Sequence, residues 1–147
     1  MYPMGTLATV GPLNYNVLET EWLTQIGDSL NPRVPKHKFL LIRLTISNSG
    51  NQQVAVPLLH LEDAQGNRHI EVSDAAGVPN WLGLLRILEP GPTMQGVIVF
   101  DVPASSYRLR VTDGGDLESE RTALVEIPLT LTAPVPLEPP RQPGQAF

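Results

Sequence analysis

The chain has 147 residues, no cysteine and a formal net charge of −5. A chain of this length fits one domain with a core of its own, and the lack of cysteine excludes disulfides, thiolate metal sites and a cysteine nucleophile. The acidic balance, with ten basic residues that form no large cluster, argues against nucleic acids and anionic membrane surfaces as partners.

The sequence contains no apolar run near the ~20 residues of a membrane-spanning helix. Met1 to Thr9 also lacks the basic and apolar regions of a signal peptide. Only 17% of the residues are charged, below the ~25% typical of soluble domains, so the surface should be rich in neutral polar groups. We associate such a surface with exported binding modules.

The first predicted element is an extended lead-in over residues 1–12, rich in proline and glycine. Leu13–Trp22 is predicted as a strand, and the shift of its apolar phase near Val17 indicates a bulge. After a loop, Phe39–Asn48 is the clearest strand, because aliphatic residues occupy alternate positions. Four of them are expected to share the core face: Leu40, Ile42, Leu44 and Ile46.

A turn leads into a predicted strand over Val54–Glu62, where Pro57 implies a sheet edge or a bulge. A second strand over Arg68–Val72 returns after a turn at Ala64–Asn67. The two strands are expected to form a hairpin.

The segment Trp81–Leu88 is the one part of the chain that fits a short helix, although a buried strand is the competing interpretation. As a helix it would place Trp81, Leu84, Leu85 and Leu88 on one face. Trp81 is also the residue predicted to contact a partner, flanked by Asn80 and Leu82, because an exposed tryptophan is a common interface anchor. The alternative is that Trp81 covers the open end of the core. Trp22 is predicted to lie in the core.

Three more strands are predicted towards the C-terminus. Val97–Val102 follows a proline–glycine turn, Ser106–Thr112 follows a second turn, and Thr122–Leu131 closes the domain. Tyr107 begins the middle strand, where a tyrosine can bury its ring and bond its hydroxyl to a backbone group at the corner. A plain core tyrosine is the alternative.

These elements divide the chain into the lead-in over 1–12, a β domain over 13–132 and a proline-rich, polyproline-like tail over 133–147. Seven to nine short strands with frequent turns predict an all-β fold, an immunoglobulin-like antiparallel β-sandwich.

Several short motifs over about Leu13 to Leu131 resemble the bacterial DUF4352 domains. They are Asn48-Ser49-Gly50, the turn Asp63–Gly66, Leu88-Glu89-Pro90-Gly91, Gly96, Phe100-Asp101-Val102-Pro103 and Tyr107. The resemblance implies a telokin-like, immunoglobulin-like sandwich that is typically exported or lipid-anchored and whose molecular function is largely unassigned. The location that it implies is extracytoplasmic or membrane-anchored, through a segment outside this chain. It supplies no catalytic residues, and this chain lacks the lipobox cysteine of typical members.

Three groups of residues are candidates for chemistry. Asp113, Asp116, Glu118 and Glu120 could gather oxygen ligands for calcium but lack the regular spacing of a calcium loop, so a solvated hairpin tip is the alternative. His60 and His69 could begin a zinc site, but a third ligand is not evident. Ser105 and Ser106 lack the glycine elbow of a serine hydrolase and fit a turn.

The sequence therefore predicts a non-enzymatic, exported or surface-associated domain that binds a protein or an envelope component, without a cofactor. The alternative function is a small-ligand module for carbohydrate or metal. Pro57 and the bulge near Val17 would protect sheet edges, which favours a monomer.

Overall fold

A computed structural model describes residues 1–27, 32–115 and 119–129. The regular structure of these residues is entirely β, as predicted. Ten strands follow one another along the described chain: β1 (Leu7–Val10), β2 (Leu13–Leu23), β3 (Lys38–Asn48), β4 (Val54–Ala55), β5 (His60–Glu62), β6 (Arg68–Ile70), β7 (Ile87–Leu88), β8 (Thr93–Val102), β9 (Tyr107–Thr112) and β10 (Thr122–Ile127).

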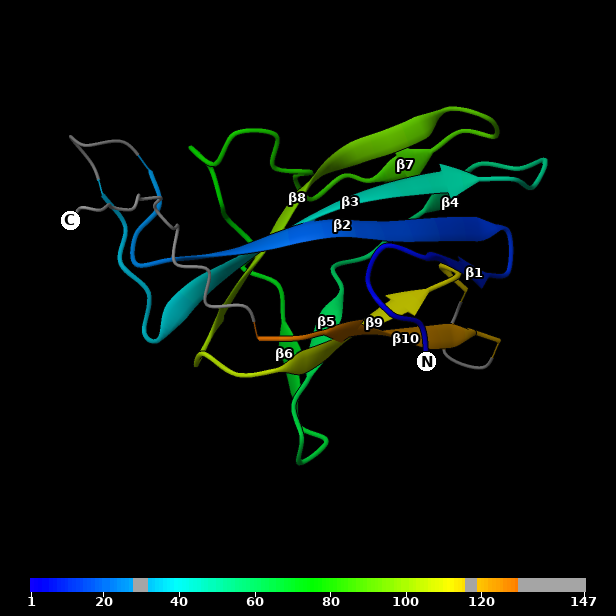
Figure 1. The fold of residues 1–147 in the computed structure, drawn as a ribbon. Coiled ribbons are helices and arrows are strands. Elements are labelled where there is room, and N and C mark those ends of the chain that lie inside the picture. Colours follow the sequence, from blue (N-terminus) through cyan, green and yellow to red (C-terminus); the bar gives the residue numbers. More distant parts are fainter. Residues whose placement is uncertain (28–31, 116–118, 130–147) are drawn as a thin grey trace, which may run out of the picture.

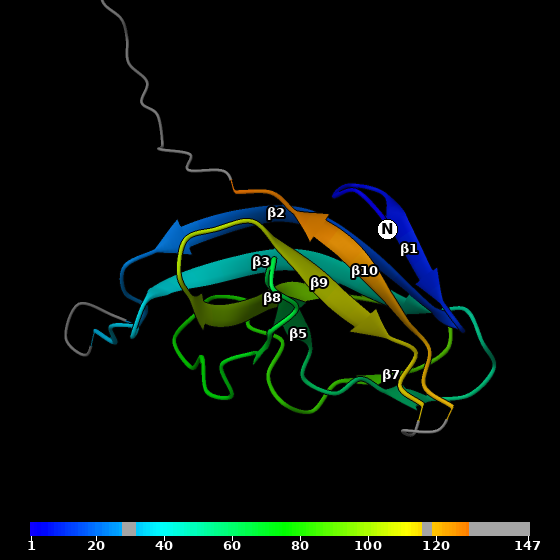
Figure 2. The same ribbon diagram turned by 90° about the horizontal axis from the view of Figure 1, so that it is seen from below.

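Two antiparallel sheets pack face to face as a sandwich (Figures 1 and 2). Within the described residues one sheet has the order β1-β2-β3-β8, the other has the order β10-β9-β5-β6, and β4 and β7 pair separately. The immunoglobulin-like β-sandwich predicted from the strand pattern is confirmed.

The core lies between the sheets and is filled by alternate side chains of the long strands. All four residues predicted on the core face of β3 are completely buried. They face buried residues of the second sheet such as Leu61 and Leu109. The predicted bulge in β2 is also present, since the pairing of β2 with β3 shifts between Val17 and Glu19. Trp22 is half-buried and packs against the edge of this core.

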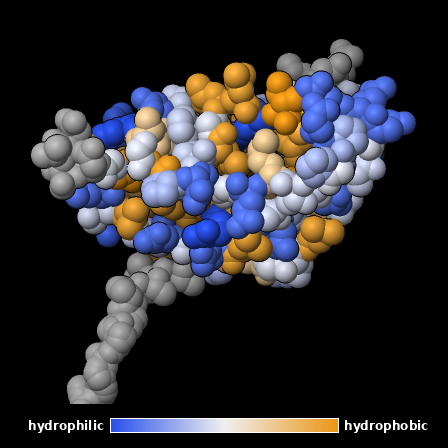
Figure 3. All heavy atoms as spheres, turned by 90° about the horizontal axis from the view of Figure 1, so that it is seen from above, coloured by the Kyte–Doolittle hydropathy of each residue, from blue (hydrophilic) through white to orange (hydrophobic). Residues whose placement is uncertain are grey.

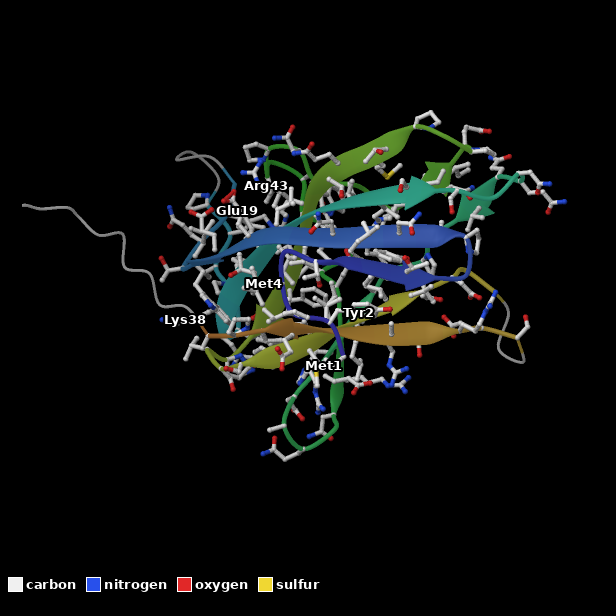
Figure 4. All side chains as sticks on the ribbon, turned by 45° about the vertical axis from the view of Figure 1, so that its right-hand side comes forward. Met1, Tyr2, Met4, Glu19, Lys38 and Arg43 are labelled. Atoms are coloured by element: carbon white, nitrogen blue, oxygen red, sulfur yellow. The ribbon has the colours of Figure 1, made fainter. Side chains whose placement is uncertain are left out.

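The first twelve residues are more than the extended lead-in that the sequence predicted. Leu7–Val10 forms β1, whose Ala8 and Val10 are buried in the core. The Tyr2 amide donates to the Leu124 carbonyl at 2.9 Å, so this segment also joins the second sheet. Figure 4 shows Tyr2 and Met4 lying between β2 and β10, where they close one side of the sandwich.

The predicted strand over Val54–Glu62 is wrong as one element. It divides around Pro57, which has no amide hydrogen to donate to a ladder. Its first part, β4, pairs with β7, and its second part, β5, pairs with β6 and β9. The hairpin of β5 and β6 is confirmed, and its turn is held by Asp63 Oδ1, which accepts the amides of Gln65 and Asn67, each at 2.9 Å.

The predicted tyrosine corner is confirmed. The Tyr107 hydroxyl donates to the Pro103 carbonyl at 2.5 Å, while the residue is buried. The expected strand over Thr122–Leu131 ends earlier, at Ile127, and Leu129 is exposed. Leu131 and the predicted tail over 133–147 lie outside the described residues.

Candidate functional site

The segment Asn80–Ile87, here called the apolar loop, contains the predicted partner-binding residues. It is extended and not helical, so the predicted helix over Trp81–Leu88 is wrong. Gly83 adopts a φ of 77°, a left-handed conformation that interrupts a helix, and the segment ends in β7.

The loop begins by pairing with the outer edge of β8. The Asn80 carbonyl accepts the Val97 amide at 2.8 Å, and the Leu82 amide donates to the Val97 carbonyl at 3.0 Å. This close approach requires Gly96, because a Cβ there would lie 2.6 Å from the Asn80 carbonyl oxygen and 2.5 Å from Leu82 Cδ2. The loop thus protects part of an edge strand that could otherwise pair with another chain.

Trp81 is half-buried in a second hydrophobic cluster, formed on the outer face of the β1-β2-β3-β8 sheet. Its neighbours there include Phe39, Val97 and Val99, from β3 and β8. Trp81 therefore does not cover the open end of the main core. Asn80 is exposed and Leu82 is half-buried, and a partner-binding role for these three residues stays a prediction.

A buried ion pair fixes the second half of the loop. Arg86 Nη1 donates to Glu71 Oε2 and Arg86 Nη2 to Glu71 Oε1, each at 2.6 Å, and neither side chain is exposed. The Leu59 amide also donates to Glu71 Oε2 at 2.6 Å, and Arg86 Nε donates to the Gly83 carbonyl at 2.8 Å. Such charge-assisted, bidentate bonds hold a loop in one geometry.

The ion pair reverses the usual polarity of a loop, because the charged residue is buried and the apolar residues are exposed. Arg86 points inward, while Leu84, Leu85 and Ile87 are 55%, 86% and 47% exposed. Arg86 is also the one charged residue between Ala75 and Leu88, so the tip offers no exposed charge. Hydrophobic atoms gather along the upper margin of Figure 3, which is the far side of Figure 1, where β7 lies.

Sequence reasoning missed Leu84, Leu85 and Ile87 as surface residues. The helical pattern placed Leu84 and Leu85 on one face with Leu88, and of these three leucines only Leu88 is buried. The signal available in the sequence was the single arginine inside a run of apolar residues, because an enclosed guanidinium needs a carboxylate partner elsewhere in the chain.

The loop that carries Asp113, Asp116, Glu118 and Glu120 forms no metal site among its described residues. Asp113 Oδ1 accepts the amides of Gly115 and Arg121, at 2.9 and 3.1 Å, and Asp113 Oδ2 lies 3.2 Å from Arg121 Nε. Burial acts to raise the pKa of Asp113, but these bonds outweigh it and hold the pKa below its ordinary value. Glu120 accepts the Thr112 hydroxyl. Asp116 and Glu118 lie outside the described residues.

The two histidines of the hairpin do not face each other, so the zinc interpretation is wrong. His60 pairs with Ile70 while His69 pairs with Leu61, and successive positions of a strand point to opposite faces. His69 Nε2 lies 3.1 Å from Asp63 Oδ2. Among the residues that the structure describes, no group of three His, Cys, Asp or Glu side chains could hold a metal ion.

The predicted turn at Ser105 and Ser106 is used structurally. The Leu129 amide donates to Ser106 Oγ at 3.1 Å, which ties the end of β10 to the start of β9. Both serines are exposed, and their hydroxyls bond backbone groups.

A family model described as a domain of unknown function, DUF4352, matches residues 2–121. This chain belongs to the DUF4352 family. The yjhA protein from Bacillus subtilis has a similar structure, with a TM-score of 0.67 and 19% identity over 86% of this chain and 99% of its own. A functionally unknown protein from Listeria monocytogenes matches with a TM-score of 0.62 and 12% identity over 85% of this chain and 82% of its own.

A third similar structure is ycdA from Bacillus subtilis, named as a candidate lipoprotein. Its TM-score is 0.64 and its identity 12%, and the match covers 84% of this DUF4352 chain but only 38% of the ycdA chain. At these identities the similarities show the fold alone. No curated protein sequence matched the chain. In its described part, no helix has the length and apolar character needed to cross a membrane.

Proposed function

We propose that this DUF4352 domain is a non-enzymatic interaction module that docks on a protein partner through its apolar loop. The observation that carries the proposal is the buried Glu71–Arg86 pair, which holds the loop so that Leu84, Leu85 and Ile87 face solvent. Exposing three large aliphatic side chains in one short loop is unfavourable in water, so contiguous patches of this kind commonly mark binding sites.

The rigid presentation of the loop suits this role. A flexible loop loses conformational entropy when it binds, whereas a loop already fixed by a bidentate ion pair and by β8 loses less. Trp81 and Leu82 lie beside the exposed residues and can extend the contact, as the sequence predicted. Depletion of charge at the centre of the patch is typical of protein interfaces.

The non-enzymatic part of the proposal is supported by the use already made of the polar groups. Asp63, Glu71 and Asp113 accept backbone amides or pair with cationic side chains, which leaves them committed to the fold. A general acid or base would need a carboxylate or imidazole directed at a substrate.

An extracytoplasmic, exported or surface-anchored location completes the proposal. Its support is the low share of charged residues and the structural similarity to ycdA, a candidate lipoprotein. Fractionation of cells that express the full-length protein tests the location directly. Recovery in the cytoplasm alone would contradict it.

Site-directed photocrosslinking in the native host tests the docking surface. A photoreactive residue at Leu85 should give a discrete crosslink to one protein, and the same residue at Val34, which is also exposed at 75%, should not. The crosslink should disappear when Leu84 and Ile87 are changed to serine in the same chain. Equal crosslinking from both positions, or labelling of lipid alone, would contradict a protein partner at this loop.

A further inference from the structure

A groove of about 490 Å³ lies on the other sheet, away from the apolar loop. It lies between the start of β9, the end of β10 and the turn that joins β5 to β6. Its charged side chains include Arg108 and Glu126, and its exposed apolar residues are Met1, Ala64 and Pro128. A groove of this size that brings a few charged and apolar side chains together can hold a small ligand.

Charges alternate across the outer face of this sheet. Glu126 of β10 is registered with Arg108 of β9, Arg108 with Glu62 of β5, and Glu62 with Arg68 of β6. Arg110 lies one step along β9 on the same face. A regular ladder of this kind would normally pair every charge with its neighbour.

The ladder is not fully paired, because Glu62 pairs with Arg110 and Arg68 and not with Arg108. Its Oε2 accepts Arg110 Nε at 2.7 Å and Arg110 Nη2 at 2.5 Å, and it lies 3.5 Å from Arg68 Nε. Within the part of the chain that the structure describes, the Arg108 side chain makes one long hydrogen bond, 3.3 Å from Nη2 to the Asp63 carbonyl.

Arg108 and Glu126 are therefore a cation and an anion side by side, both without an ion-pair partner in the described part of the chain. Glu126 is exposed and Arg108 is half-buried. Cross-strand neighbours have Cβ atoms about 5 Å apart. An α-amino acid carries its carboxylate and its ammonium group on one carbon, which matches so short a separation.

We propose that this groove binds a free α-amino acid. Arg108 donates two hydrogen bonds to the ligand carboxylate, Glu126 accepts from the ammonium group, and an apolar ligand side chain packs against Ala64 and Pro128. The site goes beyond the proposed docking function, since it lies on different strands and uses different residues.

Titration of the isotope-labelled chain with the standard amino acids, followed by NMR, tests the site. At least one amino acid should shift the resonances of Arg108, Glu126 and their neighbours. Its N-acetyl and amide derivatives, each lacking one charge, should bind at least about tenfold more weakly. Silence across all the amino acids, or equal binding of the capped forms, would overturn the proposal.

Variants assign the two contacts. Arg108→Gln and Glu126→Gln should each weaken the strongest ligand by about tenfold or more, while Glu21→Gln, an exposed carboxylate on the other sheet, should leave binding unchanged. Arg108→Lys keeps the charge but loses the bidentate geometry of the guanidinium. Its affinity should therefore lie between those of wild type and Arg108→Gln, a graded order that a folding defect would not produce. Wild-type affinity in Arg108→Gln and Glu126→Gln would contradict the assignment.

Discussion

At the residue scale, the buried pair of Glu71 and Arg86 determines the conformation of the apolar loop. Both side chains are enclosed, so each depends on the other for its charge to be tolerated. The pair is a cause of the exposed apolar tip, because it fixes which side of the loop faces inward. The stability of the fold should therefore respond strongly when one member alone is removed.

Glu71→Ala should lower the free energy of unfolding by roughly 3–5 kcal/mol, because it leaves an uncompensated guanidinium in the interior. Urea denaturation measures this loss. The control is Glu19→Ala, which breaks the exposed pair with Arg43, 2.8 Å apart and labelled in Figure 4, and should cost less than about 1 kcal/mol. Similar losses in the two variants would contradict the enclosed pair.

At the element scale, carboxylates hold two of the turns. Asp63 accepts two backbone amides in the turn from β5 to β6 and lies beside His69, and Asp113 does the same work after β9. Burial acts to raise the pKa of Asp63, but its hydrogen bonds with His69, Asn67 and Gln65 outweigh it, so the pKa lies below its ordinary value of 3.8.

These lowered pKa values predict acid sensitivity. A carboxyl group whose folded pKa is depressed stabilises the fold fully above its unfolded pKa, and this contribution is lost as the pH falls from about 4 through the folded pKa. Denaturation midpoints measured from pH 6 downward should show the loss. The double variant Asp63→Asn, Asp113→Asn should flatten the profile, and an unchanged profile would count against these two groups.

The sequence pattern did not predict that the N-terminal segment contributes a strand to the sandwich. β1 is only four residues long, and the glycines around it read as lead-in. Deleting residues 1–10 should destabilise the fold by about 3 kcal/mol or more, because it uncovers the core beside β2 and β10. Deleting the predicted tail, 133–147, should leave the denaturation midpoint unchanged. An unchanged denaturation midpoint after deletion of residues 1–10 would contradict a structural role for this segment.

At the scale of the whole molecule, the sandwich was predictable because its evidence is local and repeated. Parity alone places Leu40, Ile42, Leu44 and Ile46 inside, and the tyrosine corner needs only the proline turn before Tyr107. A period of two residues survives over eleven residues of β3 and leaves little ambiguity.

The apolar loop was not predictable in the same way. Apolar residues at positions 81, 84, 85 and 88 fit a helix, and eight residues cannot distinguish that helix from an extended segment. Its conformation depends on Glu71, fifteen residues before Arg86, and on the approach to β8 that Gly96 permits. Site residues defined by such long-range contacts do not follow from a local pattern.

Cysteine labelling tests the central claim most directly, since the chain contains no native cysteine. Leu85→Cys and Leu88→Cys would share a face in a helix, whereas the structure leaves Leu85 86% exposed and Leu88 2% exposed. We expect a maleimide to react with the cysteine at position 85 as fast as in the unfolded chain, and with the cysteine at position 88 far more slowly. Equal protection of both positions would contradict an outward-facing apolar loop.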